Sequence, residues 1–419
     1  ALPISLTWVV TAYLLAATAA LPVYGKLSDL FGRVRMLNIG IGLFLAGSVA
    51  CALAQDLPTL LAARVLQGLG GGGLIALAFT VIADCIPPRE VGKYQGYISA
   101  VYAVSSIAGP LLGGYFTEQL SWRWIFWINL PLGALALWLV NRNLGHLNVR
   151  RHSRFDWKGA GLLITVTTLS LLLLSPETAL SAIWLAAGLA LALLLLILVE
   201  RRAQDPILPA HLARLPGYLV SVLLALASQL LMFAVLVYLP LQMQWQKGMG
   251  ASESGLYMVI FMVCITAGAF VGGKLIGRTG HYKRFVVVGF ALAALALWQI
   301  HFDLFANLGL GFAGLGLGLV LPALSVVVQN ALPREDRGIG MSLFNFGREL
   351  GGAVGVAICA VLFHGALPAG TSHNLASLSP AELAPGFSAT YVGMAMIASA
   401  AFLITLLALK RHELASIPA

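Results

Sequence analysis

Long apolar stretches, separated by short polar connections, run through the whole chain. Each is roughly 20 residues long, the length that a helix needs to cross the hydrocarbon core of a bilayer. Polar and apolar residues do not alternate within them, as they would in the strands of a membrane barrel. The pattern predicts an all-α membrane protein with thirteen spans, near residues 7–24, 37–54, 59–84, 95–117, 124–141, 157–175, 181–199, 218–241, 254–276, 285–304, 306–329, 339–363 and 388–409.

Composition agrees with a membrane protein. The 419 residues are 59% hydrophobic and 10% charged, whereas soluble domains carry about 25% charged residues. The net charge of +9 would suggest nucleic-acid binding in a soluble protein, but basic loops at a membrane surface explain it here, and we expect no nucleic-acid partner. The sequence holds no metal-ligand cluster, nucleotide-binding loop or nucleophile elbow, and its four cysteines are scattered. We therefore expect no enzyme, no cofactor and no metal site.

The connections alternate between strongly basic and nearly neutral. Of the 25 Lys and Arg residues, 21 lie in every second connection or in the C-terminal tail. Because cytoplasmic loops of membrane proteins are rich in Lys and Arg, this set is assigned to the cytoplasm together with the C-terminus. We expect a multi-pass protein of the inner or plasma membrane.

A short charged stretch occurs twice. Gly25–Arg35 is repeated 248 positions later as Gly273–Lys283, again between two apolar stretches. Four positions are identical, and Gly277 stands where Asp29 does. A charged connection that recurs at the same place in two hydrophobic halves indicates a duplicated membrane protein.

The number of spans leads to a domain prediction. Thirteen crossings and a cytoplasmic C-terminus would place residue 1 outside, so we expect one further helix before Ala1. The order is then six spans, two spans and six spans. Residues 1–145 would form the N-terminal half, 146–214 two extra linker helices with basic flanking loops, and 215–419 the C-terminal half.

Arg64 lies inside a predicted span, where a charge is costly and marks a functional site. Gln67 and Gly68 follow at helical spacing, so Arg64 faces a polar interior rather than lipid. One interpretation is a cation that promotes release of a proton from a nearby carboxylate. The other is an arginine that ties helices together through backbone carbonyls.

Arg348 and Glu349 lie near the middle of a later span. Adjacent helical residues do not face each other, so we expect the two not to be each other's best partner, and Glu349 shares a face with Asn345. A single carboxyl at this depth is the simplest proton carrier and would also attract an organic cation. The alternative is a buried neutral Glu that is hydrogen-bonded to its neighbours.

Glycines and a proline punctuate two of the spans. Gly347, Gly351 and Gly355 form a ridge of small residues, which predicts close helix packing. A bent, tightly packed helix is predicted by a second set, namely Gly96, Ser105, Gly109, Pro110, Gly113 and Gly114.

Asp29 is predicted to lie just after a helix end, with Arg33 and Arg35 beside it. A solvated turn is one interpretation. In the other, the acid lies at the N-terminus of a helix from the other half and stabilises one conformation. Asp84 is predicted at the same membrane face and could pair with Arg33.

Together these stretches resemble the fourteen-span drug:H+ antiporter family of the major facilitator superfamily. Gly25, Asp29, Gly32, Arg33 and Arg35 match its signature loop, although Leu30 and Val34 stand where a basic residue is usual. Arg64-Val-Leu-Gln67-Gly68 resembles the fourth-span motif, and the Gly96–Gly114 stretch resembles the antiporter motif, with Ser105 in place of a glycine. The family also typically has a stretch like the one from Trp122 to Pro131, which begins Trp122-Arg123-Trp124-Ile-Phe126 and includes Asn129 and Pro131. The family often has an acid in the tenth span, and residues 254–276 contain none.

The resemblance implies two six-helix halves with two inserted central helices. It also implies a proton-coupled exporter of amphipathic, cationic compounds that works by alternating access as a monomer in membrane lipid. Glu349, Arg64 and Arg348 would couple transport to protons. A conformational switch would comprise Gly25, Asp29, Gly32, Arg33, Arg35 and Asp84. Apart from the resemblance, polar or aromatic residues on otherwise apolar helices predict a substrate cavity that includes Tyr13, Gln67, Gln229, Phe344 and Asn345.

One alternative function stays open from the sequence. Because the shape of a cavity sets its specificity, the chain could instead be an exporter or flippase of one metabolite or lipid. A partner protein cannot be named from the residues.

Overall fold

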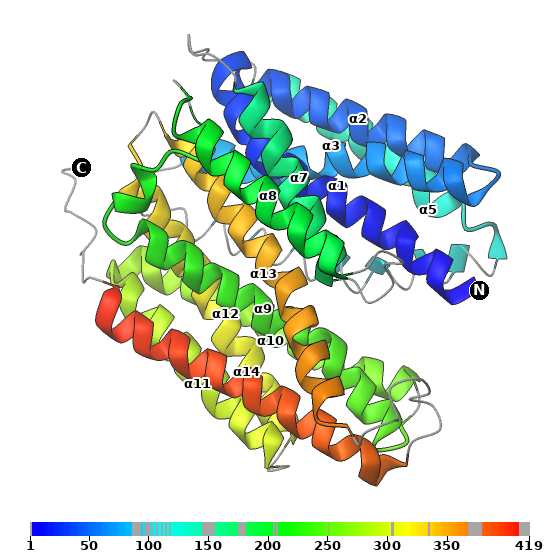
Figure 1. Cartoon of the computed structure of the whole chain (residues 1–419), viewed down its shortest axis with the longest axis vertical. Coiled ribbons are helices and arrows are strands. Elements are labelled where there is room, and N and C mark those ends of the chain that lie inside the picture. The colour runs from blue at the N-terminus through cyan, green and yellow to red at the C-terminus, as the bar shows by residue number, and fades with distance from the viewer. Residues whose placement is uncertain are drawn as a thin grey trace. The chain divides into compact units, whose positions relative to one another are not determined.

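The computed structural model describes residues 2–85, 94, 97, 101, 104–105, 108–109, 112–113, 115–116, 119–144, 156–174, 182–203, 206, 208–249, 251–302, 306–333, 336–367 and 379–409. These residues are helical apart from short connections (Figure 1). The helices are α1 (Leu2–Phe31), α2 (Arg33–Leu53), α3 (Leu57–Cys85), α5 (Trp124–Trp127), α6 (Asn129–Leu144), α7 (Trp157–Leu174), α8 (Ala182–Glu200), α9 (Tyr218–Trp245), α10 (Ala251–Thr279), α11 (Tyr282–His301), α12 (Ala306–Ala331), α13 (Arg337–Gly365) and α14 (Pro380–Ala408).

The predicted all-α membrane fold is confirmed. Within the described ranges, nine helices are long and apolar enough to cross a membrane. Each predicted span coincides with described helix except 95–117, most of which lies outside the described residues. The predicted span 124–141 is divided into α5 and α6 at Ile128.

The first of two compact units comprises residues 1–85, 108–213 and 332–346. Helices α1, α2 and α3 pack on one another around buried Leu21, Tyr24 and Leu77. Glycines on α3 make this packing close, because a Cβ at Gly72 would overlap the backbone of Ala17 on α1. Helix α7 contacts α1, and α8 lies alongside α7 (Figure 1).

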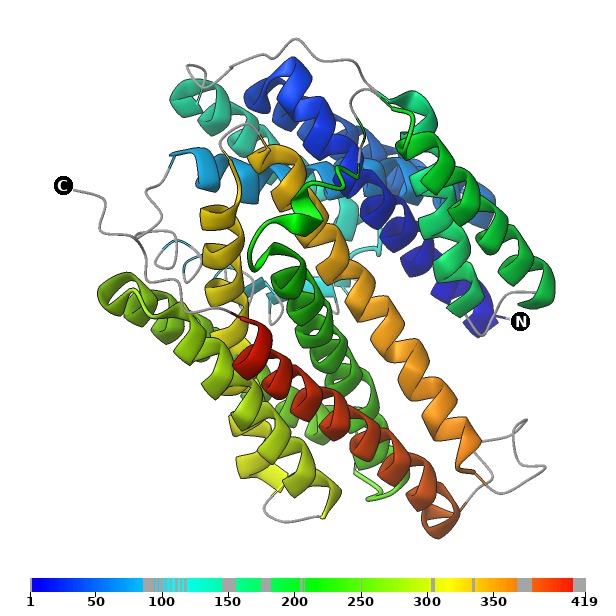
Figure 2. The ribbon, with the colours of Figure 1, turned by 60° about the vertical axis from the view of Figure 1, so that its left-hand side comes forward.

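The second unit comprises residues 86–107, 214–331 and 347–419. In it α12 packs between α10 and α11, and α14 packs on α11 and α9. The later part of α13 runs along α9 (Figure 2), where a Cβ at Gly351 would overlap the carbonyl of Leu226 and one at Gly355 would crowd the backbone of Leu230. The predicted small-residue ridge is therefore a site of close helix packing.

The repeated charged stretch is mostly helix, which corrects one prediction. Helix α1 continues to Phe31 and the chain turns at Gly32, whose φ is 95°. Asp29 therefore lies inside a helix, and its placement after a helix end was wrong. Charged side chains do not end a helix, whereas a residue with positive φ does, and glycine adopts that conformation without strain.

The same turn closes the second copy of the repeat. Helix α10 continues to Thr279, and the chain turns at Gly280, whose φ is 70°. Gly280 lies 248 positions after Gly32. The repeat that the sequence indicated is thus also a repeat of backbone structure.

Candidate functional site

The turn after α1 holds a compact polar cluster. Arg33 forms an ion pair with Asp29, and the two side chains are 12% and 8% exposed. Nη1 of Arg33 also donates to Oγ of Ser28 at 2.6 Å, and that hydroxyl donates to the carbonyl of Gly25 at 2.8 Å. Arg35 is exposed, and the side chain of Asp84 lies outside the described residues.

The first turns of α13 are seated against this cluster within the first unit. A Cβ at Gly338 would overlap the Asp29 carboxylate and the Arg33 guanidinium. A Cβ at Gly25 would likewise overlap the side chain of Ser342. The Asp29 carboxylate therefore lies beside the beginning of α13, where the positive end of the helix dipole favours an anion.

A second polar contact between side chains lies at the beginning of α13. Nε2 of His211 lies 2.8 Å from Oδ2 of Asp336, although His211 is 59% exposed. Asp336 immediately precedes α13, and its carbonyl accepts from the backbone N–H of Gly340 at 2.7 Å. No local signal in the sequence connects His211 with Asp336, because 125 residues separate them and neither lies in a motif.

Arg64 on α3 is held by groups from three helices. Its Nε donates to the carbonyl of Val9 on α1 at 2.9 Å, and its Nη1 donates to Oε1 of Gln67 at 2.6 Å. The guanidinium lies 4.4 Å from the centre of the Tyr13 ring and 5.9 Å from that of Phe126. The bond to the Val9 carbonyl is the contact expected of an arginine that ties helices together, and a role of Arg64 in proton release stays a prediction.

Arg348 and Glu349 on α13 form an ion pair, which corrects another prediction. Nη2 of Arg348 donates to Oε1 of Glu349 at 2.8 Å, with side chains 14% and 23% exposed. The Cβ atoms of adjacent helical residues do diverge, but the Arg side chain is long enough to fold back over one residue. Helix α9, which packs against this part of α13, offers no competing charged side chain because it contains no acidic or basic residue.

The predicted cavity residues lie in different surroundings. Tyr13 is half-buried beneath Arg64, and Gln67 is hydrogen-bonded to Arg64. Gln229, Phe344 and Asn345 are 4%, 1% and 0% exposed. None of the five lines the pocket described below, and their contact with a substrate stays a prediction.

The predicted antiporter motif is described only in part. Gly96, Pro110 and Gly114 lie outside the described residues. Ser105 and Gly109 are helical and exposed, and a Cβ at Gly109 would meet no described atom within 4 Å. Among the described residues, no atom approaches Gly109 closely, and the nearest one to a Cβ at Gly113 is 4.0 Å away.

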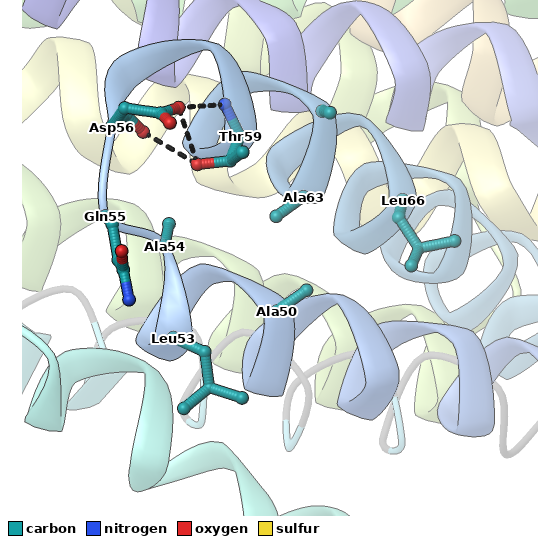
Figure 3. A pocket seen from close by; sticks show the side chains of 9 residues that line it. Ala50, Leu53, Ala54, Gln55, Asp56, Thr59, Ala63 and Leu66 are labelled. Carbon is teal, nitrogen blue, oxygen red and sulfur yellow. Dashed lines mark hydrogen bonds between the residues drawn. The ribbon is translucent and has the colours of Figure 1, made fainter.

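A pocket of about 520 Å³ lies where α2 ends and α3 begins (Figure 3). Its walls are mostly apolar, and its one acid, Asp56, points toward Thr59. Oδ1 of Asp56 accepts from the backbone N–H of Thr59 at 2.8 Å and from its hydroxyl at 2.7 Å. These bonds to the first turn of α3 hold the pKa of Asp56 below its usual value, so this carboxylate is occupied as a helix cap.

The motif around Arg123 closes the same end of the first unit. Nη2 of Arg123 donates to the carbonyl of Ala54 at 2.9 Å, and its guanidinium lies 4.6 Å from the centre of the Trp122 ring. Phe126 packs with Cys51 and Ala63 in a buried cluster. This motif therefore ties α5 to the ends of α2 and α3 and provides one of the rings near Arg64.

Comparisons with known proteins agree with this architecture. The sequence profile described as Major Facilitator Superfamily matches residues 3–356. The chain is 33% identical over 372 residues to the multidrug transporter protein MdtP of Bacillus subtilis, and the alignment covers 86% of this chain and 68% of that protein. It is 35% identical over 370 residues to an uncharacterized MFS-type transporter of Mycobacterium tuberculosis, and this alignment covers 85% of this chain and 54% of the relative. The chain thus spans about half the length of that relative.

A solved structure shares the fold. The human organic anion transporter MFSD10 (TETRAN) superposes with a TM-score of 0.69 and 16% sequence identity, and the alignment covers 95% of this chain and 83% of that one. At this identity the likeness concerns the fold alone. With the profile match and the similar relatives, it shows that the chain is an integral membrane protein with the major facilitator fold and belongs to the major facilitator superfamily.

Proposed function

We propose that this chain is part of a proton-coupled exporter that exchanges protons for amphipathic, cationic compounds by alternating access. The observation that carries the proposal is the 33% identity, over 86% of the chain, to a protein named as a multidrug transporter. Charged side chains within the helices supply the groups that proton coupling needs.

Glu349 is the proposed site of exchange. Its carboxylate is paired with the Arg348 guanidinium, so a proton or a cationic substrate that binds Glu349 competes with that contact. A proton and a substrate cation then compete for one carboxylate, which is the minimum that antiport requires. Protonation would also release Arg348 from its partner, so the charge of the site changes with each cycle.

Two further groups would act with Glu349. Arg64 would promote proton release from a carboxylate, as a nearby cation favours the ionised form. Asp29 and Arg33, which lie beside the beginning of α13, would bias which side of the transporter is open. The basic connections would face the cytoplasm, and each charge moved through 100 mV supplies about 2.3 kcal/mol.

Proton release from vesicles tests the proposal directly. Inside-out vesicles carrying the full-length protein are energised, the internal pH is followed with a quenched dye, and cationic drugs are added singly. We expect drugs to release protons from vesicles with the wild-type protein, and Glu349→Gln to reduce that release at least about tenfold. Arg64→Ala should fail similarly while both variants are expressed normally.

Glu382→Gln provides a matched control for Glu349→Gln. Glu382 is exposed in the first turn of α14, where it completes a capping box with Ser379, and glutamine serves equally in that motif. This variant should release protons as the wild type does. Unchanged release in Glu349→Gln would remove Glu349 from the mechanism, and the absence of any drug response in the wild type would favour the exporter of a single metabolite or lipid.

A further inference from the structure

A buried chain of hydrogen bonds connects Arg64 to two other helices, and its direction is fixed by chemistry. An arginine side chain only donates, so Gln67 must accept from Arg64 through Oε1. The amide nitrogen of Gln67 then faces the other way and donates to Oγ of Ser48 on α2 at 2.8 Å. The orientation of the Gln67 amide is therefore set by Arg64 and Ser48, and the Cys51 thiol donates to the same Oε1 at 3.9 Å.

Ser48 is fully engaged in this chain. Its hydroxyl accepts from Gln67 and from Nδ2 of Asn129 on α6 at 3.2 Å, and it donates to the carbonyl of Phe44 at 2.8 Å. Ser48 is 0% exposed and Gln67 is 2% exposed, so no solvent replaces a lost partner there. A buried amide that loses its acceptor is costly, and the network favours a single arrangement.

Close packing of α2 on α3 makes the contact possible. A Cβ at Gly47 would lie 2.5 Å from the Cα of Gln67. Any side chain at that position would push the two helices apart and lengthen the bond between Ser48 and Gln67. The backbone at Gly47 therefore sets the distance over which Ser48 reaches the next helix.

Arg64 is consequently held on two sides. Val9 and Tyr13 of α1 contact it from one side, and the chain through Gln67 reaches it from the other. Its remaining terminal nitrogen, Nη2, makes no hydrogen bond in the described part of the chain. The network orients the guanidinium and leaves the N–H groups of Nη2 available.

We infer that Ser48 and Asn129 are positioning residues for Arg64. Acting through Gln67, they hold the guanidinium in the orientation in which Nη2 meets a carboxylate during proton release. The transport part of this inference rests on the proposed function, whereas the connection between Ser48 and Arg64 does not.

Thermal unfolding measures the connection without any transport. The variants Ser48→Ala, Arg64→Met and the double variant are compared in detergent. If the two residues act through one network, the fall in melting temperature of the double variant is clearly smaller than the sum of the two single falls. Additive falls would overturn the inference. Ser221→Ala is the control, because Ser221 is 0% exposed but its hydroxyl has no partner in the described ranges.

Transport then distinguishes a positioning role from a structural one. We expect Ser48→Ala and Asn129→Leu to lower proton-driven efflux about tenfold, while downhill drug movement without a proton gradient stays within about twofold of wild type. Equal losses in both assays, or no loss in either, would overturn the inference. Arg64→Ala is measured in parallel. If this variant leaves proton-driven efflux intact, the proposed role of Arg64 in proton coupling is wrong, and so is the transport part of the inference. The unfolding experiment would still decide whether Ser48 and Arg64 are connected.

Discussion

The two copies of the charged repeat have the same backbone but different charges. Both long helices end one residue before a glycine of positive φ, at Gly32 in the first unit and at Gly280 in the second. The first copy carries Asp29, and the second has Gly277 in its place. Duplication has therefore kept the turn and changed what it binds.

Each turn contacts the end of another helix within its own unit. In the first, the Asp29 carboxylate lies beside the beginning of α13. In the second, Nζ of Lys283 donates to the carbonyl of Leu406, near the end of α14, at 2.7 Å. An acid lies at a helix N-terminus and a cation at a helix C-terminus, as the helix dipole favours. The comparison teaches that one turn can hold either end of a helix when the sign of its charge is matched.

The largest effect is expected from filling the space at Gly338. In Gly338→Ala the new methyl group would overlap Asp29 and Arg33, so the ion pair or the start of α13 must move. Overpacking of this kind costs about 1–3 kcal/mol, and we expect the rate of drug efflux to fall about tenfold or more. Initial rates in vesicles, normalised to the amount of protein, measure it.

Gly42→Ala is the matched control for Gly338→Ala. It also lies in a helix of the first unit, and a Cβ there would meet nothing within 4 Å. Its efflux rate should equal that of the wild type. An active Gly338→Ala protein would show that the start of α13 can leave the turn without consequence.

A smaller effect is expected from Asp29→Asn, which removes the charge but keeps the shape. Losing an anion from a partly buried helix N-terminus costs about 1 kcal/mol, equivalent to roughly a fivefold change. Because a gate affects conversion between states, turnover should slow while drug affinity changes little. Rates and drug binding are measured on the same preparation, and a pure loss of affinity would contradict a gating role.

Asp56→Asn controls for removal of an acid at a helix start. Asp56 caps α3 through Thr59, is exposed, and asparagine caps helices about as well as aspartate. Its turnover should be unchanged. Slowing equal to that of Asp29→Asn would make the effect one of general charge rather than of the turn.

Much of the fold could be predicted from the sequence, because it depends on local patterns. The apolar stretches located the helices, and the 248-residue offset between Gly25–Arg35 and Gly273–Lys283 predicted a duplication that the turns at Gly32 and Gly280 share. Membrane helices must be long and apolar, so the local residue composition is enough to locate them. The extent of α1 was missed because the part beyond the apolar stretch is helical but charged.

The candidate sites were harder, because their contacts join residues that are distant in sequence. Arg64 was singled out as a charge in an apolar stretch, but nothing in the sequence connected it to Ser48, whose residue type is common in membrane helices. The pairing of His211 with Asp336 had no local signal either. Arg348 and Glu349 are adjacent, yet helix geometry alone predicted the wrong outcome, because it omits the length of the Arg side chain.

The smallest effect is expected at the second turn, from Lys283→Met. The substitution keeps an apolar stem of similar length and removes the hydrogen bond to Leu406. A cation at an accessible helix C-terminus contributes about 0.3–1 kcal/mol, so the melting temperature should fall by only a few degrees and transport should be little changed. Arg284→Met, which removes an exposed cation one position later, should leave the melting temperature unaltered. If Lys283→Met instead slowed turnover as strongly as Asp29→Asn, both turns would act as gates. The second turn, with Gly277 where the first has Asp29, would then differ from the first in charge but not in role.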